Sequence, residues 1–229
     1  MRNCALATDY DGTLATHGKV DEQTLSALTR FLLSGRKLLL VTGRELPDLK
    51  QVFPHLSLFT RVIAENGALL YDPATDEETL LCEPVPRSFL STLRELEVPF
   101  SAGRVLVATV EPHQDAVRKV IAESGLDLQV SLNKGAVMVL PATVNKATGL
   151  QHALAELGLD ARSVVGIGDA ENDCDFLNLC GCSAAVANAL PSVKSSVHVV
   201  TAGTHGAGVA EILDRMLADN LPISADERG

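Results

Sequence analysis

The sequence predicts an α/β protein in which a parallel sheet flanked by helices forms the core and a smaller α+β unit is inserted into it. Short apolar runs alternate with amphipathic segments near both ends of the 229-residue chain, which is typical of strand and helix units in a parallel sheet. Between residues 72 and 140 this alternation gives way to a different pattern. At roughly 150 residues per domain, the length suits one core with one smaller insertion.

The first part of the predicted core contains three buried strands. They are short apolar runs at residues 4–8, 37–41 and 61–64. A helix precedes the second strand, because Leu25, Leu28 and Leu32 recur at helical spacing. Gly35 ends this helix. Residues 67–71 continue in an extended conformation after the third strand.

The predicted insertion begins with an acidic, proline-containing connector that starts at Asp72. Its predicted elements are a helix, a strand, a helix and a two-stranded hairpin, at residues 87–97, 104–110, 113–124, 128–132 and 136–140. Asn133-Lys134-Gly135 supplies the turn of the hairpin. We therefore predict a core of residues 1–71 and 141–218, an inserted unit of residues 72–140, and a polar tail of residues 219–229.

The core pattern resumes after Pro141. A helix is predicted at residues 146–157, where Gly158 ends it, and a strand follows at residues 163–167. Two more strands and a final helix complete the prediction, at residues 183–186, 197–200 and 209–217.

Composition excludes several classes of function. The formal net charge is −10, with 19 Lys and Arg against 29 Asp and Glu, which argues against a nucleic-acid partner. No apolar run approaches the roughly 20 residues that span a bilayer, so no membrane association is expected. Five cysteines form no CxxC pair and are odd in number, which favours a reducing compartment and a cytoplasmic location.

Polar residues follow four of the predicted core strands at their carboxyl ends. These loops are Asp9-Tyr10-Asp11-Gly12-Thr13, Thr42-Gly43-Arg44, Glu65-Asn66-Gly67 and Gly168-Asp169-Ala170-Glu171-Asn172-Asp173. Ligands of open parallel sheets bind beyond the carboxyl ends of the strands. We therefore expect the four loops to converge on one crevice.

The residue types in these loops suit phosphoryl chemistry. Asp9 and Asp11 could divide the work, one attacking an electrophile such as phosphorus and the other moving protons. A cation must offset their repulsion of a phosphate dianion, and Asp169 and Asp173 add oxygen ligands of the kind that Mg²⁺ prefers. An all-oxygen acidic site favours magnesium over zinc.

Two further groups could bind a phosphoryl oxygen. Thr42 offers a hydroxyl and, with Gly43, backbone N–H groups before a helix, although a helix cap would use the same residue types. Lys146 lies at the start of a predicted helix, where its charge could neutralise phosphate and orient the nucleophile.

These motifs, in their order and spacing, resemble the haloacid dehalogenase-like hydrolase superfamily. The four segments that carry the resemblance are Asp9-Tyr-Asp-Gly-Thr-Leu14, Val41-Thr-Gly-Arg44, Asn145-Lys-Ala-Thr-Gly-Leu150 and Gly168-Asp-Ala-Glu-Asn-Asp173. Glu65-Asn-Gly-Ala68, Val186-Ala-Asn-Ala189 and Gly206-Ala-Gly-Val-Ala210 further resemble the Cof-like branch, in which an α/β cap is inserted between the second and third motifs. Tyr10 and Cys174 depart from the usual pattern, at positions without an evident role in the chemistry.

The resemblance implies a Rossmann-like core with a mobile cap that hydrolyses phosphate monoesters with Mg²⁺. Asp9 would be the nucleophile and a metal ligand, and Asp11 would be the acid/base and give its backbone carbonyl to the metal. Asp169 would also bind Mg²⁺, and Asn172 and Asp173 would complete the metal and phosphate shell. The remaining implied residues are Thr42, Gly43 and Lys146 on the phosphoryl group, and Arg44 and Asn66 at the entrance.

The prediction is therefore a cytoplasmic Mg²⁺-dependent phosphatase that acts on a small phosphorylated metabolite, of the sugar phosphate or phosphoglycolate type, through an aspartyl-phosphate on Asp9. A phosphomutase of the same superfamily and a non-catalytic phosphoryl-ligand sensor are the alternatives. No GxxxxGK[ST] segment supports a Walker-type NTPase. Arg104, His113 and Lys134 are the polar cap residues that could contact the substrate, and the sequence carries no sign of the oligomeric state.

Overall fold

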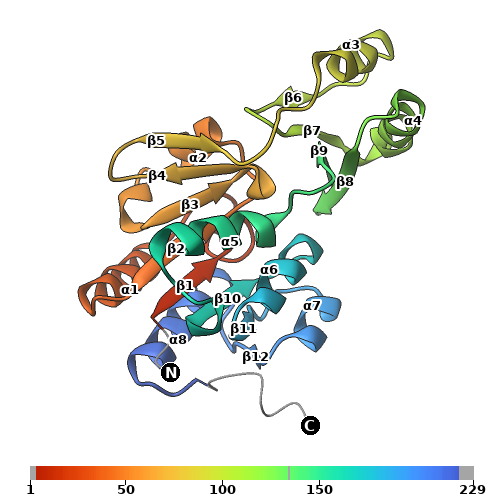
Figure 1. Ribbon diagram of the computed structural model, residues 1–229. Coiled ribbons are helices and arrows are strands. Elements are labelled where there is room, and N and C mark those ends of the chain that lie inside the picture. The colour runs from red at the N-terminus through yellow and green to blue at the C-terminus, as the bar shows by residue number, and fades with distance from the viewer. Residues whose placement is uncertain (1–3, 134, 222–229) are drawn as a thin grey trace.

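The computed structural model describes residues 4–133 and 135–221, and in them the chain forms one eight-stranded and one four-stranded sheet (Figure 1). The strand order of the large sheet is β12-β11-β10-β1-β2-β3-β4-β5. Neighbouring strands from β12 to β3 are parallel, whereas β4 and β5 add an antiparallel edge. The strands are β1 (Ala5–Thr8), β2 (Lys37–Val41), β3 (Arg61–Ala64), β4 (Leu69–Asp72), β5 (Glu77–Leu80), β10 (Val164–Gly168), β11 (Cys182–Ala185) and β12 (Val199–Val200).

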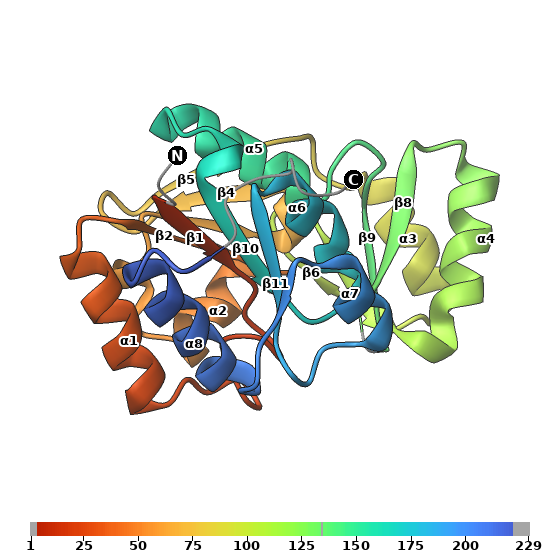
Figure 2. The same cartoon turned by 90° about the horizontal axis from the view of Figure 1, so that it is seen from below.

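Helices cover both faces of the large sheet. α1 (Glu22–Leu33) and α8 (His205–Leu217) pack side by side on one face, and α5 (Lys146–Leu157) and α6 (Cys174–Leu179) lie on the other (Figure 2). The remaining helical elements of the core are α2 (Leu46–Val52), α7 (Pro191–Ser196), η1 (Leu56–Leu58), η2 (Glu65–Gly67), η4 (Ala161–Ser163) and η5 (Glu171–Asp173). Among the described residues, no helix is long and apolar enough to cross a bilayer.

Local sequence explains where the main helices begin and end. The Asp21 side chain accepts a hydrogen bond from the Thr24 amide and caps α1, whose residues Leu28 and Phe31 are fully buried. Asn145 caps α5 in the same way, in a capping box with Thr148, and Gly158 ends that helix in the left-handed conformation. The capped start of α5 fixes the position of Lys146, its first residue.

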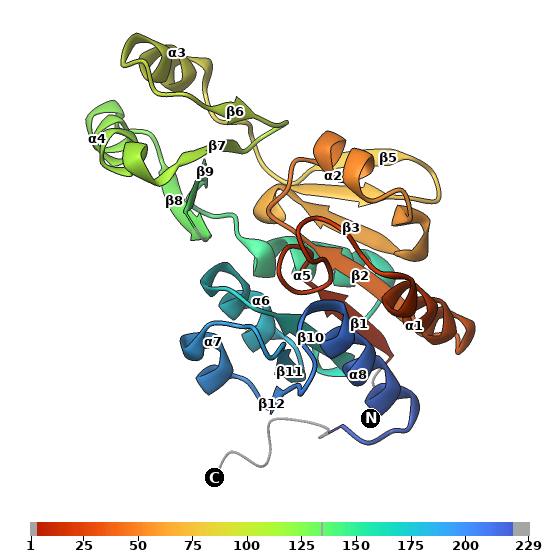
Figure 3. The same ribbon diagram turned by 180° about the vertical axis from the view of Figure 1, so that it is seen from behind.

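The smaller sheet belongs to the inserted segment. Its antiparallel order is β6-β7-β9-β8, with β6 (Ser101–Ala102), β7 (Val107–Val110), β8 (Leu128–Asn133) and β9 (Ala136–Pro141). An apolar cluster joins this sheet to α3 (Arg87–Glu95) and α4 (Gln114–Ser124), which follows η3 (Glu111–His113), and Figure 3 shows both helices on the side away from the core. A second cluster, with Leu106, Met138 and Ala68, joins the sheet to the core.

The predicted fold class is confirmed, and two segments differ from the sequence-based expectation. β5 belongs to the large sheet, whereas residues 72–140 were expected to lie in the inserted unit. All four residues of β5 are exposed, so the strand has no apolar pattern by which it could be found. The strand expected at residues 104–110 begins only at Val107, because the preceding amides donate hydrogen bonds to the side chain of Glu65. The bounds of core and insertion stay a prediction, and residues 222–229 of the expected tail lie outside the described part.

Candidate active site

The loops at the carboxyl ends of the core strands face the inserted sheet across a cavity of about 490 Å³. Its core side is formed by the loops after β1 and β2 and the start of α2, and its other side by the inserted sheet and the segments next to its strands. The lining residues are Asp9, Asp11, Gly43, Arg44, Glu45, Asp48, Ser101, Leu106, Ala108, Asn133, Ala136 and Met138. Of the four loops expected to converge on one crevice, those after β1 and β2 line this cavity.

Three carboxylates gather at the ends of β1 and β10. Asp9, Asp169 and Asp173 are buried, and each offers an oxygen within 4.8 Å of the other two. β1 and β10 are neighbours in parallel register, which brings Asp9 and Asp169 to the same edge although 160 residues separate them in sequence. The 3-10 turn η5 adds Asp173.

Lys146 lies between two of these carboxylates. Its Nζ is 2.6 Å from Asp9 Oδ1 and 2.6 Å from Asp173 Oδ1, and its side chain is fully buried. Burial by itself lowers the pKa of Lys146, but the charges of Asp173 and Asp9 outweigh it and raise the pKa above the ordinary value. Lys146 is therefore a buried cation aimed at the carboxylate cluster.

Asp9 is in an unfavourable environment for a negative charge. Burial is the largest cause and the charge of Asp173 the next, and together they raise the pKa of Asp9 from 3.8 to about 8 despite the opposing effect of Lys146. A buried carboxylate with a raised pKa is typical of functional sites. A bound cation would favour the ionised form that a nucleophile needs.

Hydrogen bonds hold the other two carboxylates in place. Asp173 Oδ2 accepts from the amides of Asp169 and Ala170, at 2.8 and 3.0 Å. The Thr13 hydroxyl donates to Asp169 Oδ1 at 3.2 Å. Thr13 has no role predicted from the sequence, although it belongs to the Asp11-Gly12-Thr13 segment.

Asn188 is a second residue without a predicted role. Its Nδ2 donates to the carbonyl of Gly12 at 2.7 Å, and its Oδ1 accepts from the amide of His205. Asn188 thereby ties the loop after β1 to the start of α8. Its place in the Val186-Ala-Asn-Ala189 segment is the sequence signal that could have found it.

Thr42 and Gly43 form the turn after β2. Thr42 is fully buried, and its hydroxyl accepts a hydrogen bond from the Arg44 amide at 3.1 Å. A Cβ atom at Gly43 would lie 3.2 Å from the sulfur of Met138 in the inserted sheet. A side chain at this position would need Met138 to shift by a few tenths of an ångström where this turn approaches the inserted unit.

Asp11 is engaged outside the carboxylate cluster. Its two oxygens pair with Nε and Nη2 of Arg44, at 2.6 and 2.8 Å, and Arg44 Nη1 pairs with Asp48. The Tyr10 ring lies under the guanidinium, 5.5 Å from its central carbon, and the Tyr10 hydroxyl donates to the Gly18 carbonyl. Tyr10, which departs from the family pattern, therefore contacts a site residue. The expectation for Asp11 as a metal ligand concerned its backbone carbonyl, and it stays a prediction.

The turn η2 links the catalytic loops to the inserted sheet. Asn66 accepts a hydrogen bond from Asn172 and donates one to Ser131 of β8. Asn172 Oδ1 is buried and has no hydrogen-bond partner among the described residues. Asn66 and Asn172, two predicted site residues, line a neighbouring cavity of about 510 Å³ together with Ser131. The Oδ1 atom of Asn172 is thus an acceptor that is available to a ligand.

Gly67 is required where η2 packs on α5. Its φ is +105°, and a Cβ atom there would lie 1.9 Å from the carbonyl oxygen of Asn145. Any side chain would displace the residue that caps α5, and with it Lys146. The Glu65-Asn66-Gly67 segment therefore helps to place the buried lysine.

Other polar residues lie away from the carboxylates. Arg104 is exposed and pairs with Glu78, and neither Arg104 nor His113 is among the residues that line the cavity. Lys134 lies outside the described residues.

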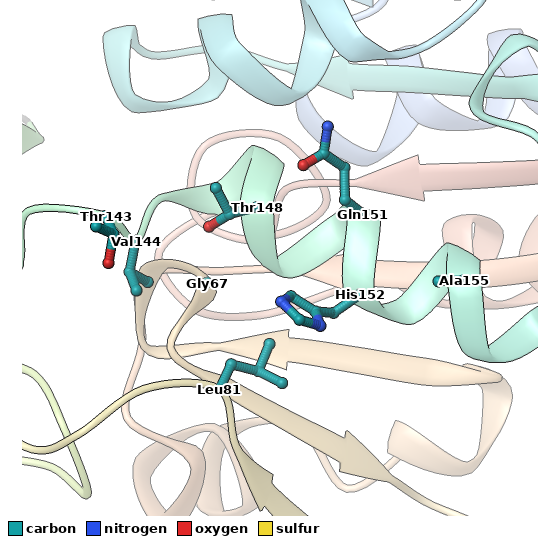
Figure 4. A pocket seen from close by; sticks show the side chains of 8 residues that line it. All are labelled: Gly67, Leu81, Thr143, Val144, Thr148, Gln151, His152 and Ala155. Carbon is teal, nitrogen blue, oxygen red and sulfur yellow. The ribbon is translucent and has the colours of Figure 1, made fainter.

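A further cavity, of about 450 Å³, is bounded by α5 and Leu81, and the His152 side chain points toward it (Figure 4). The lining of this cavity contains none of the predicted site residues.

The donor set fits a hard divalent cation. The three clustered groups are all carboxylates, and no His or Cys joins a comparable cluster among the described residues. Oxygen-only ligands are the set that Mg²⁺ prefers. A cation there would also offset three negative charges that Lys146 alone does not balance.

Comparison with known families agrees with this geometry. The family model described as haloacid dehalogenase-like hydrolase matches residues 6–102 and 95–213. The chain belongs to this family. The matched segments include all four loops at the carboxyl ends of the core strands.

Similar proteins match more than nine tenths of the chain. Phosphoglycolate phosphatase 2 of Saccharolobus solfataricus is 29% identical over 228 residues, covering 96% of this chain and 95% of its own. A phosphoglycolate phosphatase of Methanothermobacter thermautotrophicus is 30% identical over 221 residues, covering 93% and 98%. A solved structure from Thermoplasma acidophilum has the same fold, with a TM-score of 0.82 at 18% identity, over 95% of this chain and 99% of that one. The predicted family and enzyme class, a phosphatase, are thus confirmed.

Proposed function

We propose that this protein hydrolyses phosphate monoesters of small metabolites with the help of Mg²⁺, and that Asp9 is its nucleophile. The observation that carries the proposal is the buried cluster of Asp9, Asp169 and Asp173 with Lys146 between two of its members. The naming of the similar proteins as phosphoglycolate phosphatases makes 2-phosphoglycolate the first substrate to test.

We propose that some residues of the site bind the cation and that others bind the phosphoryl group of the substrate. Asp9, Asp169 and Asp173, with the backbone carbonyl of Asp11, would hold the cation. When bound, the cation supplies charge neutralisation and orientation of the substrate's phosphoryl group. Lys146 keeps Asp9 oriented and offers positive charge to a phosphoryl oxygen. The Thr42 hydroxyl, the Gly43 amide and the Nδ2 group of Asn172 would donate hydrogen bonds to the other phosphoryl oxygens.

The reaction has two halves. In the first, an Asp9 carboxylate oxygen forms a bond to phosphorus while the bond to the leaving oxygen breaks, and Asp11 gives that oxygen a proton. In the second, Asp11 takes a proton from water, the water oxygen attacks phosphorus, and the bond to Asp9 breaks. Inorganic phosphate and an alcohol are the products, and both carboxyl groups return to their starting state.

We propose that the inserted unit, from the end of β5 to residue 140, acts as a cap. Its inner face covers the cavity with Leu106, Ala108, Ala136 and Met138, which exclude water from the phosphoryl group. Ser101 and Asn133 are its polar lining residues within the described part.

We also propose a cytoplasmic location, in keeping with five cysteines that are all free thiols.

The decisive experiment is phosphate release by the wild type and the Asp9→Asn variant. We expect Asp9→Asn to lose turnover by at least about 10⁴-fold while remaining folded, because an amide cannot form the covalent intermediate. EDTA should silence the wild type, and Mg²⁺ should restore it. Asp214→Asn, which changes an exposed carboxylate paired with Arg30, is the matched control and should keep full activity.

Two results would contradict the proposal. One is an Asp9→Asn variant that hydrolyses an aryl phosphate at the wild-type rate. The other is conversion of one hexose phosphate into its isomer without release of phosphate, which would identify a phosphomutase.

A further inference from the structure

The pairing of Asp11 with Arg44 conflicts with the role proposed for Asp11. Both carboxylate oxygens are held by the guanidinium in a two-point contact, at 2.6 and 2.8 Å. A group that gives a proton to the leaving oxygen must be within hydrogen-bond reach of it. The ionised carboxylate held by Arg44 has no proton to give. Asp11 must therefore leave Arg44 and take up a proton from solvent before it can protonate the leaving oxygen.

Arg44 itself is anchored independently of Asp11. Asp48 pairs with Nη1, and the Tyr10 ring supports the flat face of the guanidinium. The Arg44 carbonyl also accepts the Glu65 amide at 3.0 Å. Because these contacts do not involve Asp11, the guanidinium would stay in place when Asp11 moves away.

The charges of the residues that line the cavity indicate what Arg44 could bind. Asp9, Asp11, Glu45 and Asp48 line the cavity, and Arg44 is the one cationic side chain among the described lining residues. Lys146 is already committed to Asp9 and Asp173. A second anionic group on a substrate would thus find its partner at Arg44.

We propose that Arg44 recognises a carboxylate on the substrate and, in binding it, releases Asp11 to the leaving oxygen. Arg44 is then a specificity-determining residue that also positions the acid/base. The exchange replaces one carboxylate by another on the same two nitrogens, so the guanidinium keeps its geometry. The side chains of Arg44 and Asp11 are 24% and 38% exposed, and a pair this exposed is weak enough to exchange.

The inference rests on the proposed function and names its substrate class, a short phosphate monoester that carries a carboxylate. A substrate without the second anion leaves Asp11 on Arg44 and is turned over slowly. The presence of a carboxylate on the substrate therefore changes kcat as well as KM. A carboxylate that only contributed to binding would change KM alone.

The test compares 2-phosphoglycolate with 2-hydroxyethyl phosphate, which has the same length and an alcohol in place of the carboxylate. For Arg44→Gln we expect kcat/KM on 2-phosphoglycolate to fall about 10- to 100-fold, as for loss of a charged hydrogen-bond partner. On 2-hydroxyethyl phosphate we expect kcat to rise roughly two- to fivefold, because Asp11 is no longer held. Arg61→Gln, whose partners Asp72 and Glu156 lie outside the cavity, is the control and should change neither.

Three outcomes would overturn the inference. The first is an equal loss on both substrates in Arg44→Gln, which would indicate a structural role. The second is a wild type that treats both substrates alike, in which case the phosphatase function stands and the role of Arg44 fails. The third is a Lys134→Gln variant that no longer prefers 2-phosphoglycolate to 2-hydroxyethyl phosphate, while the Arg44→Gln variant keeps this preference. Failure of the wild type to release phosphate from either substrate would instead contradict the proposed function.

Discussion

At the scale of single residues, Asp9 lies in an environment that disfavours its ionised form. It shares a buried cluster with two more carboxylates, and Lys146 lies within hydrogen-bond distance of Asp9 and Asp173. Burial disfavours the ionised form of a carboxyl group, and a neighbouring negative charge adds to this effect. The protein therefore holds its nucleophile in an environment that becomes favourable when a cation arrives.

This environment predicts a pH-dependent stability. The pKa of Asp9 is raised from 3.8 to about 8, so between these values the folded protein keeps a proton that the unfolded chain has lost. The contribution of Asp9 to stability is therefore fully present below pH 3.8 and is lost as the pH rises through about 8. In EDTA, we expect Asp9→Asn to become increasingly stable relative to the wild type as the pH is raised from about 5 to about 8.

The measurement is urea unfolding of both proteins across this pH range. The difference between the two free energies of unfolding isolates Asp9 from the other titrating groups. Saturating Mg²⁺ should reduce the difference, because a cation favours ionised Asp9. A stability difference that does not change with pH in EDTA would contradict the raised pKa.

At the scale of elements, the turn η2 joins the two sheets through one buried carboxylate. Glu65 accepts hydrogen bonds from three successive amides of the inserted segment, those of Arg104, Val105 and Leu106, at 2.8, 2.8 and 2.9 Å. Its side chain is fully buried, and a Cβ atom at Gly103 would lie 2.5 Å from it. Three amides thus replace water around this charge, as in an anion-binding loop. Because Leu106 lines the cavity, Glu65 also positions part of its wall.

Removing the charge of Glu65 should loosen this connection. We expect Glu65→Gln to lower the free energy of unfolding by about 2–3 kcal/mol, because its amide group cannot accept from all three donors and leaves one unsatisfied. Hydrogen exchange at the amides of residues 104–106 should accelerate more than exchange in β1. Glu95→Gln, at an exposed position in α3, is the control. Unchanged exchange at residues 104–106 would show that Glu65 does not hold this segment.

At the scale of the whole molecule, the cation site depends on segments that are distant in sequence. Asp9 ends β1, whereas Asp169 and Asp173 follow β10, on the other side of the inserted unit. A ligand that binds only the folded state stabilises it by mass action, by about 2.7 kcal/mol at a concentration 100 times its dissociation constant. We therefore expect Mg²⁺ to raise the melting temperature of the wild type.

Asp169→Asn should remove most of this shift, because it deletes one of the three clustered carboxylates. Thermal unfolding with and without Mg²⁺ measures this shift in melting temperature, and Asp214→Asn is the matched surface control. An equal shift in Asp169→Asn and the wild type would place the stabilising cation elsewhere.

The elements with a strong apolar pattern are those that the sequence predicts well. β1 and β2 are almost wholly buried runs, and α5 is observed at its predicted bounds because a capping residue and a C-terminal glycine mark it. β5 has no buried residue, and no apolar pattern assigns it to the core sheet. The strand expected from residue 104 starts late because a side chain 39 residues away takes the amide of Arg104.

The sequence by itself determined the fold class, the family and the loops that carry the chemistry, because apolar periodicity and short motifs are local properties. Only the tertiary structure decided how those loops contact one another. It brought Asp9 to Asp169 through the pairing of β1 with β10, buried Lys146 between two carboxylates, and set Asp11 on Arg44 rather than in the cluster. These contacts depend on strand order and burial, and the residues that make them lie up to 160 positions apart.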